Sequence, residues 1–115
     1  SDRRLKENIR AFDAISILRG MGGVHAYEYV DTEVARDARY AGTHYGFIYQ
    51  DVKGSELERM CLKREDGYGA LNYHDSNLIS VVVGGVLSLD DRVKKLEKEN
   101  EQLREEINRL NARLS

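Results

Sequence analysis

An uninterrupted heptad repeat at the C-terminal end constrains the fold more than any other feature of this chain. The d positions are all leucine: Leu89, Leu96, Leu103 and Leu110. The a positions are Val93, Asn100, Ile107 and Leu114. Apolar residues at alternating steps of four and three form one stripe along a helix, and such a stripe packs against the same stripe of another helix. The segment 89–114 is therefore predicted to form a coiled coil.

The same apolar stripe continues upstream of the regular heptads. Its earlier members are Ile79, Val82 and Val86. The stripe crosses Gly84 and Gly85, and glycine is a poor helix former. We therefore expect one long helix that begins near Asp75 and is weakened at the two glycines.

A second boundary for this helix is also compatible with the residues. A helix could restart at Ser88, with Asp91 three residues later forming a capping box. In either case we expect two parts in the chain. Residues 1–74 would form a globular part, and residues 75–115 would form the long helix with its coiled coil.

The charged residues that flank the stripe favour parallel helices in register. Arg92 at a g position would face Glu97 at the next e position of a parallel neighbour, and Glu99 would face Arg104 in the same way. Each exposed pair contributes only tenths of a kcal/mol, so these pairs select a partner and the leucines supply the adhesion. The heptad alone leaves the number of helices open. The β-branched a residues and Asn100 favour a dimer, whereas Leu114 at an a position departs from the dimer pattern.

Composition narrows the classes of partner. Charged residues make up 33% of the chain and hydrophobic residues 41%, and the net charge of −2 gives no electrostatic reason to expect nucleic acid. No apolar run approaches the ~18 residues that a membrane span needs, so we expect no membrane partner. The apolar residues outside the C-terminal helix can form only a thin core, so we expect oligomerisation to complete it.

Neither a metal site nor a cofactor site is expected. Three histidines, His25, His44 and His74, are scattered and lack metal-ligand spacing. The glycines at 20–23 lack the following Lys and Ser or Thr of a phosphate-binding loop. Cys61 is the only cysteine, which excludes an intrachain disulfide, and its apolar neighbours indicate a small buried hydrophobe.

The first half of the globular part is predicted to contain a helix, a strand and a loop. Apolar spacing predicts a helix from Ala11 to about Arg19, ended by the glycines at 20–23. Residues 24–30 alternate as in a strand, and Tyr27 and Tyr29 on one of its faces are expected to pack across a sheet or an interface. Residues 31–43 are polar with little periodicity, which predicts a solvated loop.

The second half of the globular part contains short ordered pieces. We expect an ordered segment at 44–52, a turn or short helix at 54–56, and a strand at 57–63. A turn at 64–69 then leads to a short strand at 70–73 and into the helix. Short strands mixed with helices predict an α+β fold, a small mixed globular part followed by the long helix.

Ser1 and Lys6 form a candidate catalytic pair. A serine hydroxyl can act as a nucleophile, and a lysine amine can act as its base when burial or a like charge removes its proton. Residues five apart lie ~140° apart around a helix and on opposite faces of a strand. A working pair therefore requires a turn between the two residues, or a Lys6 from a second chain. Because the chain does not begin with Met, we expect it to be a fragment that was cut or cloned at Ser1.

Three segments give the chain a resemblance to a known family. The opening string Ser-Asp-x-Arg-Leu-Lys-x-Asn-Ile, residues 1–9, resembles the start of the self-cleaving C-terminal chaperone domain of phage tailspikes, tail fibres and neck appendages, which includes the endosialidase domain. Residues 44–52 resemble a second family segment, with Tyr49 in place of its usual small residue. Residues 69–73, followed by an apolar helix, resemble a third, and all three occur in the family's order.

The resemblance implies a function and an assembly. It implies a homotrimeric intramolecular chaperone that helps an upstream spike or fibre segment of the same polypeptide to fold in the host cytoplasm. It also implies a single-turnover serine endopeptidase, with Ser1 as nucleophile and Lys6 as general base, that releases the domain from the mature spike or fibre. By position alone, residues 31–43 would correspond to the family's flexible arms.

Two further functions fit the same residues. The chain could be a passive coiled-coil trimerisation module that never cuts. It could also be the equivalent self-cleaving domain of a membrane-tethered transcription factor. The sequence upstream of Ser1 would separate these readings, because a repetitive β-rich shaft indicates a viral fibre and a DNA-binding domain indicates a transcription factor.

Overall fold

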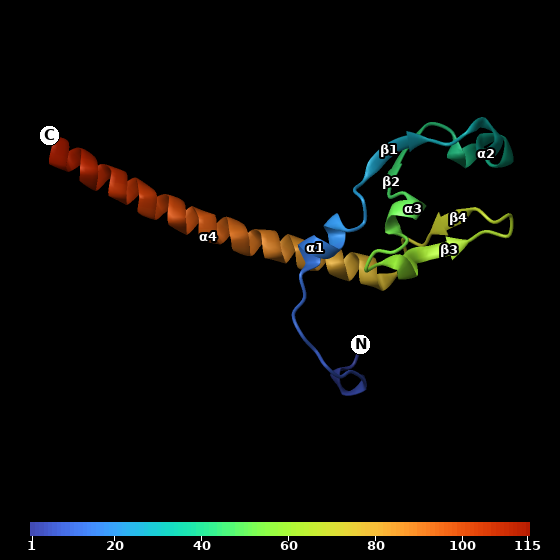
Figure 1. Cartoon of the computed structure of the whole chain (residues 1–115), viewed down its shortest axis with the longest axis horizontal. Helices are drawn as coiled ribbons and strands as arrows, with labels where there is room; N and C mark the ends of the chain where they lie inside the picture. Colours follow the sequence, from blue (N-terminus) through green and yellow to red (C-terminus); the bar gives the residue numbers. More distant parts are fainter.

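A 39-residue helix carries a small mixed α/β globular part near its N-terminal end. The computed structural model describes residues 1–115, and the long helix α4 spans Ser76–Leu114. Figure 1 shows the globular part gathered around one end of α4, while the other end of the helix projects alone. The chain measures 74 × 44 × 22 Å along its principal axes. The α+β architecture with a long C-terminal helix, which the sequence predicts, is confirmed.

Asp75 fixes the start of α4. Its carboxylate accepts a hydrogen bond from the backbone N–H of Asn77 at 2.9 Å, and it also accepts one from Nε of Arg59 at 3.0 Å. A side chain that satisfies an unpaired N–H of the first turn stabilises a helix by about 1 kcal/mol. The predicted start near Asp75 is confirmed, and the alternative start at Ser88 is wrong because α4 runs through that residue without a break.

The first helix of the globular part, α1 (Ala14–Arg19), packs on the two glycines of α4. A Cβ atom on Gly85 would lie 2.9 Å from Cδ1 of Leu18, and one on Gly84 would lie 3.2 Å from Cβ of Ala14. The missing side chains therefore let the two helices approach closely. The helix is continuous at these two glycines. The glycines therefore allow α1 and α4 to pack closely, and they are not the weak point that the sequence predicted.

Helix α1 is shorter than predicted. It begins at Ala14 and not at Ala11, because the carboxylate of Asp13 caps its first turn. The two oxygens of Asp13 accept hydrogen bonds from the backbone N–H of Ser16 at 3.1 Å and from its hydroxyl at 2.8 Å. These bonds hold the pKa of Asp13 below its usual value. The helix ends at Gly20, as the sequence predicts.

Two antiparallel strands, β1 (His25–Glu28) and β2 (Thr43–Gly46), form a hairpin. The register pairs His25 with Gly46 and Glu28 with Thr43. The segment between them contains helix α2 (Asp31–Arg36) and the 3₁₀ helix η2 (Ala38–Tyr40). The predicted solvated loop at 31–43 is therefore wrong. Acidic residues in the first turn of α2 and a basic residue in its last turn complement the helix dipole, which favours the helix.

A second hairpin follows, formed by β3 (Cys61–Lys63) and β4 (Gly69–Leu71). Helix α3 (Tyr49–Val52) and the 3₁₀ helix η3 (Glu58–Met60) precede it. The expected strand at 57–63 is confined to its last three residues, because the chain still turns through η3. The predicted turn at 64–69 is confirmed, and the backbone N–H of Arg64 donates to the carbonyl of Tyr68 across it at 2.8 Å.

The hydrophobic core is small. Six buried side chains form it: Ala14, Met21, Val52, Leu57, Met60 and Val81. They come from α1, the turn after it, the α3–η3 region and the first turns of α4, so the core joins the globular part to the long helix. Cys61 packs against this core but stays partly exposed, and burial raises the pKa of its thiol. The thin core predicted from the composition is confirmed.

Tyr27 of β1 and Tyr29, which follows the strand, pack within the first hairpin. The rings of Tyr27 and Tyr29 lie 5.3 Å apart edge to face, Tyr29 lies 4.5 Å from Tyr40, and Tyr27 stacks on His44 at 6.2 Å. A hydrogen bond between the two hydroxyls raises the pKa of Tyr29 to about 12. The prediction that Tyr27 and Tyr29 pack across a sheet is confirmed.

Candidate functional site

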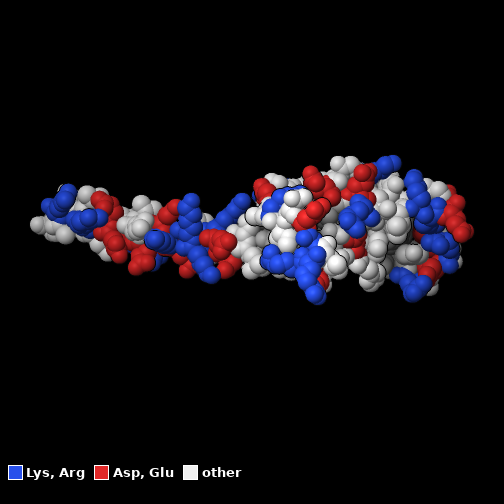
Figure 2. Space-filling view, turned by 90° about the horizontal axis from the view of Figure 1, so that it is seen from below, with Lys and Arg blue, Asp and Glu red and all other residues white.

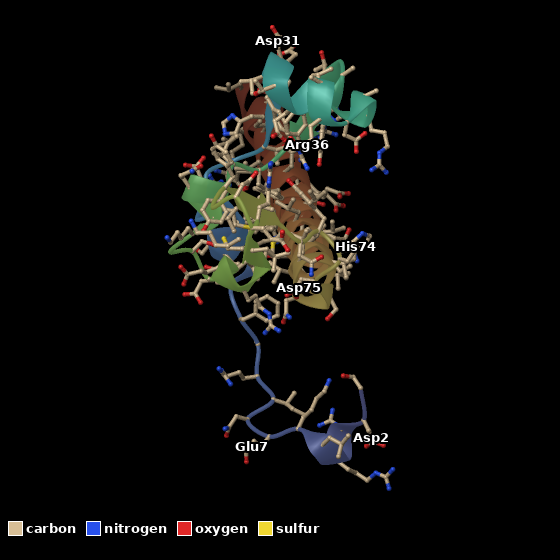
Figure 3. The ribbon with its side chains drawn as sticks, turned by 90° about the vertical axis from the view of Figure 1, so that its right-hand side faces the viewer. Asp2, Glu7, Asp31, Arg36, His74 and Asp75 are labelled. Carbon is tan, nitrogen blue, oxygen red and sulfur yellow. The ribbon has the colours of Figure 1, made fainter.

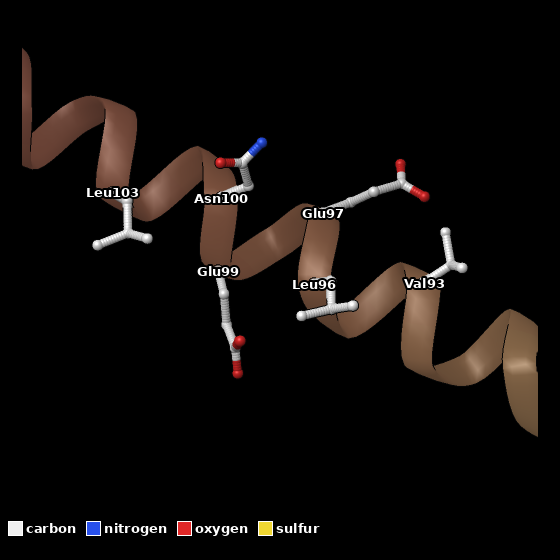
Figure 4. Close-up of a pocket in the computed structure, with 6 residues that line it drawn as sticks. All are labelled: Val93, Leu96, Glu97, Glu99, Asn100 and Leu103. Atoms are coloured by element: carbon white, nitrogen blue, oxygen red, sulfur yellow. The ribbon is translucent and has the colours of Figure 1, made fainter.

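The stripe of a and d residues at 89–114, here called the seam, is an extended apolar surface of the chain. Its apolar members are between 47% and 87% exposed, although leucine, valine and isoleucine are usually buried. Figure 4 shows Val93, Leu96, Asn100 and Leu103 along this part of α4, with Glu97 and Glu99 beside them. An exposed apolar surface of this kind marks a site of interaction with another protein.

The seam has the shape that helix packing requires. The residues of Figure 4 border a shallow hollow of about 380 Å³. In heptad packing, a side chain of one helix enters a hole formed by four residues of the next helix. The set in Figure 4 contains two consecutive holes of this type, one with Val93, Leu96, Glu97 and Asn100 and one with Leu96, Glu99, Asn100 and Leu103. The surface is therefore shaped to accept side chains at d and a positions of a second helix.

The charged residues beside the seam divide into two groups. Asp90 and Lys94 form an ion pair at 2.9 Å along the outside of the helix. The flanking residues Arg92, Glu97, Glu99 and Arg104 form no salt bridge within the chain. On the face seen in Figure 2, positive and negative side chains alternate along α4 and mix over the globular part. The flanking charges are thus available for a second helix.

The chain begins with a small turn that stands apart from the globular part. The 3₁₀ helix η1 (Arg3–Leu5) is capped by Asp2, whose carboxylate accepts hydrogen bonds at 2.8 Å from the backbone N–H and from Nη2 of Arg4. The Arg4 guanidinium lowers the pKa of the Asp2 carboxyl. Figure 3 shows Asp2 and Glu7 in this turn, which is joined to the body by an extended stretch of chain.

The turn lies between the two predicted catalytic residues. The backbone N–H of Lys6 donates to the carbonyl of Arg3 at 3.1 Å and closes η1 just before the lysine side chain. The structure therefore contains the turn that a Ser1–Lys6 pair requires. Both residues are exposed, and no hydrogen bond joins their side chains. The catalytic pair stays a prediction.

A network of charged groups at the far end of the first hairpin was not predicted from the sequence. Glu33 of α2 accepts hydrogen bonds from Nη1 and Nη2 of Arg64 at 2.9 and 3.2 Å, and from Nη2 of Arg36 at 3.0 Å. Arg64 also binds Asp66. These bonds hold the pKa of Glu33 below its usual value and raise that of Arg64. They tie α2 to the turn between β3 and β4.

The sequence offered no signal for this network, since 31 residues separate its two ends. Figure 3 shows Asp31 and Arg36 on α2, at the opposite end of the globular part from His74 and Asp75. The hairpin with α2 and η2, residues 25–46, is here called the arm. Its helix α2 and the turn between β3 and β4 both lie at the end of the globular part that points away from the free end of α4 (Figure 1).

Neither a metal-ligand cluster nor a membrane-spanning helix is found in the structure. No group of three or more His, Cys, Asp or Glu side chains lies close enough together to hold a metal ion. None of the helices combines the length and the apolar character that crossing a bilayer demands.

Fold and surface together define a class of protein. A small head is joined through a shared core to a long helix, and that helix presents an unpaired apolar seam with heptad holes. This combination is typical of oligomerisation domains, in which the head and a coiled coil assemble together.

A comparison with known families gives a match to the first part of the chain. The peptidase S74 family model, described as chaperone of endosialidase, matches residues 1–56. The match covers 56 of the 115 residues, from Ser1 through α3, and confirms the resemblance inferred from the sequence. Residues 1–56 therefore resemble an S74 chaperone domain, and this match supports an intramolecular chaperone role. No curated protein gives a significant match.

Proposed function

We propose that this chain trimerises, helps an upstream phage tail spike or tail fibre to fold, and then separates from it by cutting the peptide bond before Ser1. The observation that carries the proposal is the family match at residues 1–56, which includes the Ser1 motif. Folding and cleavage would take place in the host cytoplasm during virion assembly. The partners would be two further copies and the upstream segment of the same polypeptide.

The seam supports the assembly step. Three seams packed in parallel would bury residues that are about half exposed or more in the single chain. Holding three chains together raises the effective concentration of their upstream segments. Interlocked β-rich shafts contain many non-local contacts and fold slowly, so this pre-assembly lowers the entropic cost of their folding.

The cleavage step uses the hydroxyl of Ser1. Its Oγ attacks the carbonyl carbon of the residue before it, Lys6 Nζ accepts the hydroxyl proton, and an ester forms as the C–N bond breaks. The same proton passes to the departing nitrogen, which becomes the free amine of Ser1. Water then hydrolyses the ester, leaving a carboxylate on the upstream product. Each chain cuts once.

The exposure of the N-terminal turn links this chemistry to assembly. A lysine acts as a base at neutral pH only when its surroundings disfavour the protonated amine. Lys6 is exposed in the single chain, so we propose that the assembled trimer and the folded upstream shaft cover it. Cleavage would then follow folding and would make assembly irreversible, because the mature spike no longer carries its chaperone.

Denaturing gels of the chain joined to its natural upstream sequence test the cleavage step. The unmodified protein should separate into two fragments, and Ser1→Ala and Lys6→Ala should each stay full length. Arg3→Ala is the matched control, since Arg3 lies in the same turn at a variable position of the motif, and it should still be cut. If the unmodified protein also stays full length while sedimenting as a trimer, the chain is a passive trimerisation module and the protease proposal fails.

A further inference from the structure

Two large, exposed apolar residues of α4 lie outside the stripe of a and d positions and are not explained by it. With the heptad extended upstream, the e positions are Val83, Asp90, Glu97, Arg104 and Asn111. The b positions are Ser80, Leu87, Lys94, Glu101 and Asn108. Val83 and Leu87 are the only apolar side chains in these two sets, and they are 51% and 61% exposed. They form a short strip at one level of the helix, here called the lateral strip.

The lateral strip lies at the level of α1 but on a different, neighbouring face of α4. At 100° per residue, residues 83 and 87 lie about 40° and 100° around the helix from the a positions. Gly84 and Gly85, at about 140° and 240°, carry α1 through contacts with Ala14 and Leu18. The α1 of the same chain therefore leaves the strip uncovered. Apolar side chains occur at e and b positions of α4 only at this level, beside α1.

A groove beside the seam offers a complementary surface. Ile15, Leu18 and Arg19 of α1 form one wall, and Leu89 and Arg92 of α4 form the other, around a hollow of about 550 Å³. Leu89 occupies d and Arg92 occupies g, so the groove opens on the g side of the seam. Its floor is apolar and its rim carries two guanidinium groups.

The geometry of parallel coiled coils brings strip and groove together. The g side of each helix faces the e side of its neighbour. We propose that the lateral strip of one copy docks into the α1–α4 groove of the next, with Leu87 against the apolar side chains of the groove. Asp90, which pairs with Lys94 in the single chain, would then lie near Arg19 of the neighbour. The inference rests on the parallel assembly proposed above and adds a second, lateral interface to the seam.

This contact gives α1 a role in the assembly as well as in the core. Each α1 would be held between its own α4 and the α4 of a neighbour, so the globular parts would lock into the trimer together with the stalk. The extended stretch that joins the turn between Ser1 and Lys6 to the body leads directly into α1. The orientation of this stretch would then be set by two chains.

Cross-linking of the whole chain tests the lateral contact. In a Cys61→Ser background, Ile15→Cys combined with Leu87→Cys should give covalent dimers and trimers on a denaturing gel after treatment with a short bis-maleimide. The matched control joins Ile15→Cys with Lys94→Cys, which is also a b position but lies about 10 Å farther along the helix. The control should stay a single chain.

A second variant avoids any change in α1. Leu87→Asp should weaken association at least about tenfold by sedimentation equilibrium, whereas Asn108→Asp, with the same charge change at another b position, should leave it unchanged. A protein that sediments as a trimer but gives neither cross-links nor weaker association overturns the lateral contact and leaves the proposed function standing. A protein that sediments as a single chain overturns both.

Discussion

Replacing Leu96 and Leu103 with Asp would remove two neighbouring d residues from the seam without touching the core of the globular part. In the single chain these side chains are 61% and 62% exposed, and neither contacts the buried core residues. The variant should therefore keep its head and its helix while losing association. This separates the stability of the chain from the stability of the assembly.

The expected effect is large. Full burial of a leucine side chain contributes about 1.5–3 kcal/mol. Covering the exposed part of each of these residues therefore contributes about 1–2 kcal/mol, and a trimer contains six copies of them. The loss is about 6–12 kcal/mol per trimer before the cost of placing carboxylates in the seam is counted. Since each 1.4 kcal/mol changes an association constant tenfold, the constant should fall by about 10⁴ or more.

Sedimentation equilibrium at micromolar protein measures this effect. The unmodified chain should sediment as a trimer and the double variant as a single chain. The control is Gln102→Asp with Asn108→Asp, which adds the same charge at c and b positions outside the seam and should remain trimeric. Joined to its natural upstream shaft, the seam variant should also leave that shaft misfolded. An unchanged trimer in the seam variant would refute the heptad argument itself.

Two further predictions concern the globular part. The pKa of Glu33 lies below its ordinary value of 4.5 because Arg64 binds its carboxylate, and the pKa of Asp37 falls to about 2 beside Arg39. A carboxylate with a lowered pKa stabilises the fold above its unfolded pKa and loses this effect as the pH falls through the folded value. The arm should therefore loosen between pH of about 4.5 and about 2, seen as lower hydrogen-exchange protection in α2. Glu33→Gln should already lower that protection at neutral pH, and an equal acid response in this variant would contradict the assignment. A Cβ on Gly69 would lie 2.4 Å from the ring of Tyr49, so Gly69→Ala should destabilise the fold by about 1–3 kcal/mol in denaturant unfolding at fixed protein concentration. Adding Tyr49→Ala should recover part of this loss, and additive losses would exclude the clash.

Only those features of the candidate site that depend on neighbouring residues in the sequence could be predicted. The need for a turn between Ser1 and Lys6 follows from the geometry of helices and strands, and η1 supplies that turn through the Asp2 cap. The capping role of Asp2 was not predicted, although an Asp just before a turn is a known capping signal. The surroundings of Lys6 depend on elements outside the turn, so no property of the motif could predict them.

Sequence alone determined the long helix, its seam and its flanking charges, because a heptad is a local pattern that needs only the regular geometry of one helix. Tertiary structure decided how this helix is used. From the sequence, Gly84 and Gly85 predict a weak point in the helix, whereas in the structure α1 packs on them. The hydrogen bond between Glu33 and Arg64 joins residues that no sequence periodicity connects. Contacts between distant segments depend on how the whole chain packs, and a short window of sequence does not contain that information.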